Sequence, residues 1–160
     1  MTVLFYQWLA IISIMIYLFH GDHQFESRKA FNDNLDKLQN TDILRLDSKS
    51  INPDQINLFL QESSLFETQK ALAITNLFST TKSLLDPTLK LINNSPNIDV
   101  YLWQDKALTS TQIKNLKKIQ SKLFSLDNKL FTCLNAIKPK NITRVIPLYD
   151  QVISDGLYDL

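Results

Sequence analysis

The chain has 160 residues, a formal net charge of +1, 44% hydrophobic residues and 21% charged residues. This composition is typical of a globular protein and excludes the intrinsically disordered classes. The length leaves about 140 residues behind a terminal segment, which suits one domain with its own core and is too short for two.

The rarest residue types are glycine, with two copies, and cysteine, with one. Tight hairpins and phosphate-cradling loops both need glycine, so Gly21 and Gly156 alone favour helices over β-hairpins, Rossmann folds and P-loop folds. Cys133 excludes an intramolecular disulfide framework. We expect Cys133 to be a small buried side chain on a helix, and an intermolecular disulfide stays open.

The amino-terminal segment is an uncharged run, VLFYQWLAIISIMIYLF, over residues 3–19. Its length lies at the lower limit of what crosses a bilayer as a helix, and aromatic residues lie toward its ends. We therefore predict a membrane segment over residues 1–21. Its assigned membrane residues are Val3, Trp8, Ile11, Ile14, Tyr17 and Phe19.

Three interpretations of residues 1–21 compete. An uncleaved signal-anchor helix fits the length, and we favour it. A signal peptide cleaved after Gly21 lacks a basic start and has Phe19 where a small residue is expected. A buried core helix would be unusually apolar on all sides. The predicted location is the membrane, single-pass, with the carboxyl-terminal domain extracytoplasmic (periplasmic or lumenal), and the alternative is secretion.

The next segments read as helices joined by connectors. Residues 22–40 carry a narrow apolar stripe at helical spacing, and residues 41–50 look like a connector. Asn52 before Pro53 is a helix start, and apolar residues at helical spacing extend the pattern to residue 85. Pro87 is expected to end or kink that helix.

Residues 98–103 alternate apolar and polar side chains, which is typical of a strand. A lone strand has no partner, so we predict an extended linker that docks its aromatic residues on helices. Thr109 and Gln112 form a capping-box pattern, and apolar residues at steps of three and four predict one long helix that Pro139 ends. Residues 149–157 are expected to form a short helix.

The predicted fold is therefore all-α. An N-terminal transmembrane (or signal) helix over residues 1–21 is followed by a bundle of three to five helices, which forms the extramembrane domain of residues 22–160.

Charge is unevenly distributed along the chain. Residues 22–67 are mainly acidic, whereas residues 105–144 hold nine basic residues against Asp105 and Asp127. The nine are Lys106, Lys114, Lys117, Lys118, Lys122, Lys129, Lys138, Lys140 and Arg144.

The candidate basic contact face comprises Lys114, Lys117, Lys118 and Lys122 on the predicted long helix. It is either an ordinary solvated face or a contact for anionic lipid or nucleic acid. Nucleic-acid readers interleave arginine and aromatic residues with lysine. This helix has no arginine and turns its phenylalanines to the apolar side, so nucleic acid is not expected.

The sequence offers only weak candidates for a cluster of side chains that binds a metal, binds a ligand or performs catalysis. His20-Gly21-Asp22-His23 resembles a metal site but lacks further ligands. Tyr101 with Trp103 reads as an aromatic pair that covers the core, and less readily as a ligand platform. Asp33 with Asp36 lies on an exposed face, where nothing would raise a carboxyl pKa for acid catalysis. We therefore predict no catalytic residue, no cofactor and no metal.

The leading functional hypothesis is a membrane-anchored helical protein that acts by protein–protein contact, such as an accessory subunit or adaptor of a membrane assembly. The alternatives are a secreted helical protein with a cleaved signal peptide and a small ligand-binding or enzymatic helical bundle. Expected partners are membrane lipid through the N-terminal helix and a protein partner or second copy. The sequence leaves catalysis undecided and gives no positive sign of it.

Overall fold

The computed structural model describes residues 15–62, 69–95, 98–126 and 128–154. The chain divides into two compact units, Met1–Phe124 and Ser125–Leu160, which we describe separately. The first unit is an α/β domain and the second is a pair of helices.

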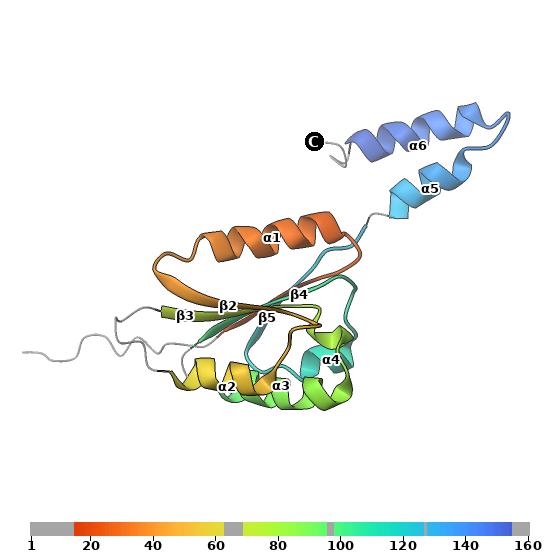
Figure 1. Ribbon diagram of the computed structural model, residues 1–160. Coiled ribbons are helices and arrows are strands. Elements are labelled where there is room, and N and C mark those ends of the chain that lie inside the picture. Colours follow the sequence, from red (N-terminus) through yellow and green to blue (C-terminus); the bar gives the residue numbers. More distant parts are fainter. Residues whose placement is uncertain (1–14, 63–68, 96–97, 127, 155–160) are drawn as a thin grey trace, which may run out of the picture. The chain divides into compact units, whose positions relative to one another are not determined.

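The first unit is built on a parallel sheet of five strands in the order β2-β3-β4-β1-β5 (Figure 1). The strands are β1 Ile16–His20, β2 Thr41–Asp47, β3 Gln69–Thr75, β4 Asp99–Gln104 and β5 Ile119–Leu123. The prediction of an all-α fold is therefore wrong. The sheet needs few glycines, because its parallel strands are joined by helical crossovers and not by tight hairpins.

Helices cover both faces of this sheet (Figure 1). Helix α1, Gln24–Asp36, lies on one face. The other face carries α2 Pro53–Gln61, α3 Lys82–Asn94 and α4 Ser110–Lys114, and a short 3-10 helix, Leu77–Ser79, follows β3. The crossovers explain why segments far apart in the sequence become neighbours: β1 lies between β4 and β5, more than 80 residues later.

Each face of the sheet has its own apolar core. Alternate residues of β4 point to opposite sides, so Val100 and Leu102 join the α2–α3 core while Tyr101 and Trp103 join the α1 core. Ile16 and Leu18 of β1 are at most 2% exposed. Burying one such side chain stabilises a fold by roughly 1.5–3 kcal/mol, so the central strands supply much of the unit's stability.

The predicted membrane segment is wrong, because its described end, Ile16–His20, is strand β1 inside this sheet. Tyr17 and Phe19 belong to β1, where Phe19 is buried against α1. Val3, Trp8, Ile11 and Ile14 lie outside the described residues. Within the described ranges, no helix is long and apolar enough to cross a bilayer. Strand β1 is apolar because both of its faces are buried, which is typical of parallel sheets.

The predictions of a membrane location and of membrane lipid as a partner relied on that segment and fail with it, as does the membrane-assembly function. The secreted and small-bundle alternatives assumed a helical domain, which the sheet contradicts. The expectation of a protein partner or second copy came from the same helical architecture, so it fails for the same reason.

Three further segments were assigned to the wrong element. Residues 41–50 contain β2, and the helical pattern extended to residue 85 contains β3, with residues 63–68 outside the described part. Residues 98–103 form β4, which has β3 and β1 as partners. In β2 and β3 the apolar residues face two helical layers, so their spacing did not distinguish strand from helix. In β4 the alternation did indicate a strand, but its partners lie far away in the sequence.

The predicted long helix after Thr109 is three elements: α4, β5 and α5 Asn128–Ala136. Its capping box is confirmed, since the Thr109 and Gln112 side chains bond each other's main chain. Two other predictions of helix position are also confirmed. Asn52 Oδ1 accepts a hydrogen bond from the Asp54 N–H at the start of α2, and α1 lies within the helix predicted over residues 22–40. Helix α3 continues past Pro87.

The second unit pairs α5 with α6, Ile142–Ser154. Cys133, Ala136 and Val152 are buried, which confirms the expected environment of the cysteine. Several large apolar side chains of this unit are 45–68% exposed. These are Phe131, Leu134, Ile137, Ile142, Ile146, Tyr149 and Ile153.

Candidate functional site

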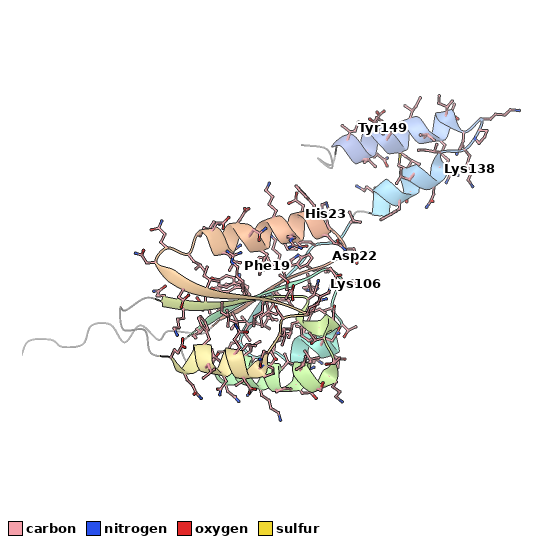
Figure 2. All side chains as sticks on the ribbon, viewed as in Figure 1. Phe19, Asp22, His23, Lys106, Lys138 and Tyr149 are labelled. Carbon is pink, nitrogen blue, oxygen red and sulfur yellow. The ribbon has the colours of Figure 1, made fainter. Side chains whose placement is uncertain are left out.

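The carboxyl ends of the strands form the edge of the sheet at which a ligand site is expected. In open parallel sheets, ligands bind where the connections of neighbouring strands leave to opposite faces. Here α1 follows β1 on one face, and α4 follows the neighbouring β4 on the other. Figure 2 shows Asp22, His23 and Lys106 gathered at this edge.

The turn between β1 and α1 is closed by the main chain that follows β5. Phe124 N–H donates to the His20 carbonyl at 2.8 Å, and His23 N–H donates to the Phe124 carbonyl at 3.1 Å. Gly21 has φ +136°, and a Cβ placed there would overlap the Phe124 carbonyl oxygen. The space next to Gly21 is therefore filled by protein.

Two N–H groups in the first turn of α1 are also occupied. Gln24 N–H bonds the Asp22 carbonyl at 2.9 Å, and Glu26 N–H bonds His23 Nδ1 at 3.3 Å. Phosphate-binding turns leave such groups free and add a lysine and a hydroxyl residue. This turn has neither, and Asp22 and Glu26 make it acidic, so it does not form a phosphate cradle.

His20 links three elements beneath this turn. Its Nδ1 accepts the Leu108 N–H at 3.1 Å, which places the ring hydrogen on Nε2, 3.0 Å from Ser121 Oγ. The ring is buried, and burial lowers the pKa of His20 below its usual value. His20 is therefore a neutral structural connection between β1, β5 and the segment after β4.

Gln104 is the second buried polar residue of this edge. Its Nε2 donates to Ser79 Oγ at 3.1 Å and to Asp105 Oδ1 at 3.0 Å. Its Oε1 accepts the Phe78 N–H at 3.2 Å, and Asn76 Oδ1 accepts the Asp105 N–H at 3.1 Å. These groups satisfy one another, so the edge is a closed hydrogen-bond network.

The candidate metal and carboxylate sites acquire no further ligands. Both ring nitrogens of His20 are engaged within the protein, and the described residues contain no group of three metal ligands. Asp33 and Asp36 lie exposed on α1, as expected.

Tyr101 and Trp103 cover the core and do not form a ligand platform. They are 5% and 4% exposed, and Trp103 Nε1 donates to Ser27 Oγ at 3.0 Å. Burial, together with nearby Asp99 and Tyr17, raises the pKa of Tyr101 to about 12.

The four lysines of the predicted contact face are divided between α4, the loop before β5 and β5 itself, and do not lie on one helix. Lys114 ends α4, Lys117 and Lys118 precede β5, and Lys122 is within β5. All four are exposed, and β5 is an edge strand. The expectation that nucleic acid is not bound assumed one continuous helix, so it loses its basis.

The loop that carries Lys117 and Lys118 is held in place by α3. Asn93 Nδ2 donates to the Asn115 carbonyl at 2.8 Å, and Asn93 Oδ1 accepts the Lys117 N–H at 2.8 Å. Lys118 has φ +49°, a region that asparagine and glycine adopt more readily than lysine. The two lysines are therefore presented on a fixed loop.

The closure by Phe124 and the Gln104 network were missed by the sequence analysis. A usable signal was present, because polar residues follow the apolar runs at His20 and Gln104. Such a change marks the ends of buried strands, whose carboxyl ends meet at one edge of a parallel sheet. The contact of Phe124 with Gly21 had no signal, since it joins main-chain atoms more than 100 residues apart.

No protein-family model and no curated protein matches the sequence. Three solved structures show partial similarity. A chain of Drosophila ORC bound to poly(dA/dT) DNA and Cdc6 has a TM-score of 0.43 and 10% identity over 83% of this chain and 27% of its own. In Drosophila ORC bound to DNA, the values are 0.39 and 18% over 77% and 40%.

The third structure is a DNA polymerase III gamma subunit-related protein from Thermotoga maritima. It has a TM-score of 0.44 and 17% identity over 86% of this chain and 48% of its own. The chain thus spans between about a quarter and a half of these proteins. Similarity of this size assigns neither a family nor a ligand.

Replacing Gly21 by alanine tests the closed turn. The added methyl group overlaps the Phe124 carbonyl, and φ +136° strains any L-residue. We expect G21A to lose more than about 3 kcal/mol of unfolding free energy in urea titrations, or to fail to fold. D22A, at the exposed neighbour, should stay within about 0.5 kcal/mol of the parent protein. Equal stability of G21A and D22A contradicts the closure.

Replacing His20 by asparagine tests the neutral ring. Because the folded-state pKa is lowered, the unfolded chain binds more protons below about pH 6.5. Stability from His20 is therefore complete at neutral pH and falls as the pH drops toward the folded-state pKa. Urea titrations at pH 8.0 and 5.5 should show a smaller loss in H20N, whose amide oxygen can still accept the Leu108 N–H. An unchanged loss contradicts this role.

Proposed function

We propose that this chain binds the phosphate backbone of nucleic acid through the cations of residues 105–144, without a bound nucleotide. The observation that carries the proposal is the exposure of all nine of these cations on the folded chain. Nucleic-acid binding by backbone contact depends on such a concentration of exposed lysine and arginine.

In the first unit, the supporting contact surface follows the edge strand β5. Lys118 and Lys122 lie about 13 Å apart along the strand direction, with Lys114 and Lys117 beside Lys118 in the sequence. Within the described part of the chain, none of these four forms an ion pair with a carboxylate. Their charge is therefore available to an external anion.

The shape of this surface favours nucleic acid over a membrane. Lys118 and Lys122 are spaced along one edge strand, which suits a linear polyanion, whereas a bilayer surface is contacted by a broad face. Aromatic side chains on the neighbouring strand β1 are turned into the α1 core, where Tyr17 stacks on Tyr101. Contact with phosphates therefore has more support than stacking with bases.

The closed edge supports binding without a nucleotide cofactor. Phe124 fills the space beside Gly21, and the N–H groups of Gln24 and Glu26 have partners within the chain. The fold is thus a fixed α/β support for its basic surface.

Charge reversal of the fixed loop tests the contact. K117E/K118E should weaken binding of a fluorescein-labelled 20-base-pair duplex at least about tenfold in anisotropy titrations. The slope of log K against log salt should become shallower by about two, since two phosphate contacts are lost.

K29E/K37E is the matched control, because it changes the net charge equally at exposed positions in α1 and at its carboxyl-terminal cap. It should bind within about twofold of the parent protein. Equal loss in both variants, or binding of vesicles rich in anionic lipid in preference to the duplex, contradicts the proposal.

Thermal unfolding with nucleotides tests the closed edge. A ligand at 100 times its Kd stabilises the folded state by about 2.7 kcal/mol, which raises Tm by several degrees. We expect no change in Tm with 1 mM Mg-ATP, Mg-ADP or Mg-GTP. A saturable rise in Tm with any of them would contradict the proposal that no nucleotide is bound.

A further inference from the structure

The turn between α5 and α6 contains a second group of cations, within the second unit. A hollow of about 590 Å³ is lined by Lys138, Lys140 and Arg144, together with the amide residues Asn135 and Asn141. No aspartate or glutamate is among its described lining residues. The hollow therefore presents positive charge and hydrogen-bond donors with no neutralising group of its own.

Two hydrogen bonds hold the backbone of this turn. Asn141 N–H donates to the Lys138 carbonyl at 3.2 Å, and Asn141 Nδ2 donates to the Ala136 carbonyl at 2.6 Å. Pro139 and Lys140 are the central residues, and Lys140 has φ +64°. Proline followed by a residue with positive φ is the arrangement of a type II turn.

Lysine is an unfavourable choice at this position. The third residue of a type II turn is normally glycine or asparagine, because a Cβ at positive φ is strained. The chain has asparagine at two other positions with positive φ, Asn40 and Asn76. It has lysine at Lys118 and Lys140, and both lie within residues 105–144, which hold the nine cations. The charge at Lys140 is thus present at the expense of local stability.

Arg144 is unfavourable for a related reason. It lies in the first turn of α6, which has no acidic residue. Cations at this end of a helix are repelled by the helix dipole, whereas anions are attracted. A bound anion in the hollow would relieve both this repulsion and the mutual repulsion of the three cations.

We propose that this hollow, the α5–α6 turn site, binds a phosphate group, and that the phosphate belongs to a nucleic-acid backbone. The first part depends on the cation-lined hollow alone, and the second part rests on the proposed function. Arginine pairs with two phosphate oxygens at once, while Lys138 and Lys140 supply point charges. The site adds a contact to those along β5 and reads no base sequence.

The decisive variant is K140G, because stability and binding should change in opposite directions. Glycine relieves the backbone strain, so the midpoint of urea unfolding should rise or stay equal. Removal of the charge should weaken duplex binding by about threefold to tenfold in the anisotropy titration. R144Q should likewise weaken binding with no loss of stability. K37Q, at the carboxyl-terminal cap of α1, is the control for loss of one positive charge and should bind as the parent protein does.

Inorganic phosphate, titrated into the ¹⁵N-labelled full chain, separates the two sources of the phosphate group. Saturable shifts of the Lys140 and Arg144 amides that K140G weakens, together with weaker duplex binding, support the inference. Such shifts with unchanged duplex binding would assign the site to a free phosphate compound and overturn the nucleic-acid part.

The outcomes also separate this site from the β5 surface. If K117E/K118E weakens duplex binding but K140G and R144Q do not, and phosphate causes no shifts at the turn, the inference is wrong while the proposed function stands. If duplex binding survives all of these changes, the proposed function fails as well.

Discussion

Two main-chain hydrogen bonds between Phe124 and the β1–α1 turn hold the first unit in its observed form. They join the residue after β5 to the β1–α1 turn, at His20 and His23. The contact is close enough that only a residue without a side chain fits at Gly21. It fixes the edge strand β5 against β1 and occupies the space where a parallel sheet of this layout would admit a ligand.

The same constraint accounts for the polar residues at the carboxyl edge. His20 and Gln104 are buried, and each has its hydrogen-bonding groups satisfied by neighbouring main chain and side chains. Buried polar groups with complete partners stabilise one arrangement, and an incomplete set would be costly. An edge organised in this way is rigid, so the exposed basic surface and not the edge is the better candidate for contact with a ligand.

Residues 105–144 include three basic residues at positions where they are unfavourable for local stability. Lys118 and Lys140 have positive φ, and Arg144 lies in the first turn of a helix. Strained residues cluster at functional sites, where the strain serves binding or catalysis. Their presence here therefore supports the proposed contacts with phosphate. These positions occur in both units, and each unit presents its cations on a turn or loop held by asparagine side chains.

The sequence by itself determined the local signals that depend on neighbouring residues. Asn52 before Pro53 and the Thr109–Gln112 capping box were identified correctly, because a cap bonds main-chain groups two or three residues away. The buried character of Tyr101, Trp103 and Cys133 also followed from residue type. The uneven distribution of charge is a property of the residue order alone and needs no knowledge of the fold.

The tertiary structure alone decided the element type of the apolar segments. Residues 16–20 and 99–104 are strands because their partners lie far away in the chain, and both of their faces are covered by helices. Burial on two faces removes the alternation that normally identifies a strand, so β1 resembled a membrane helix. Strand β4 does alternate, but it was interpreted as a linker because its partners β1 and β3 were not recognised as strands. The closure at Gly21 was equally hidden, since Phe124 reaches it through main-chain atoms, which the identities of the residues do not encode.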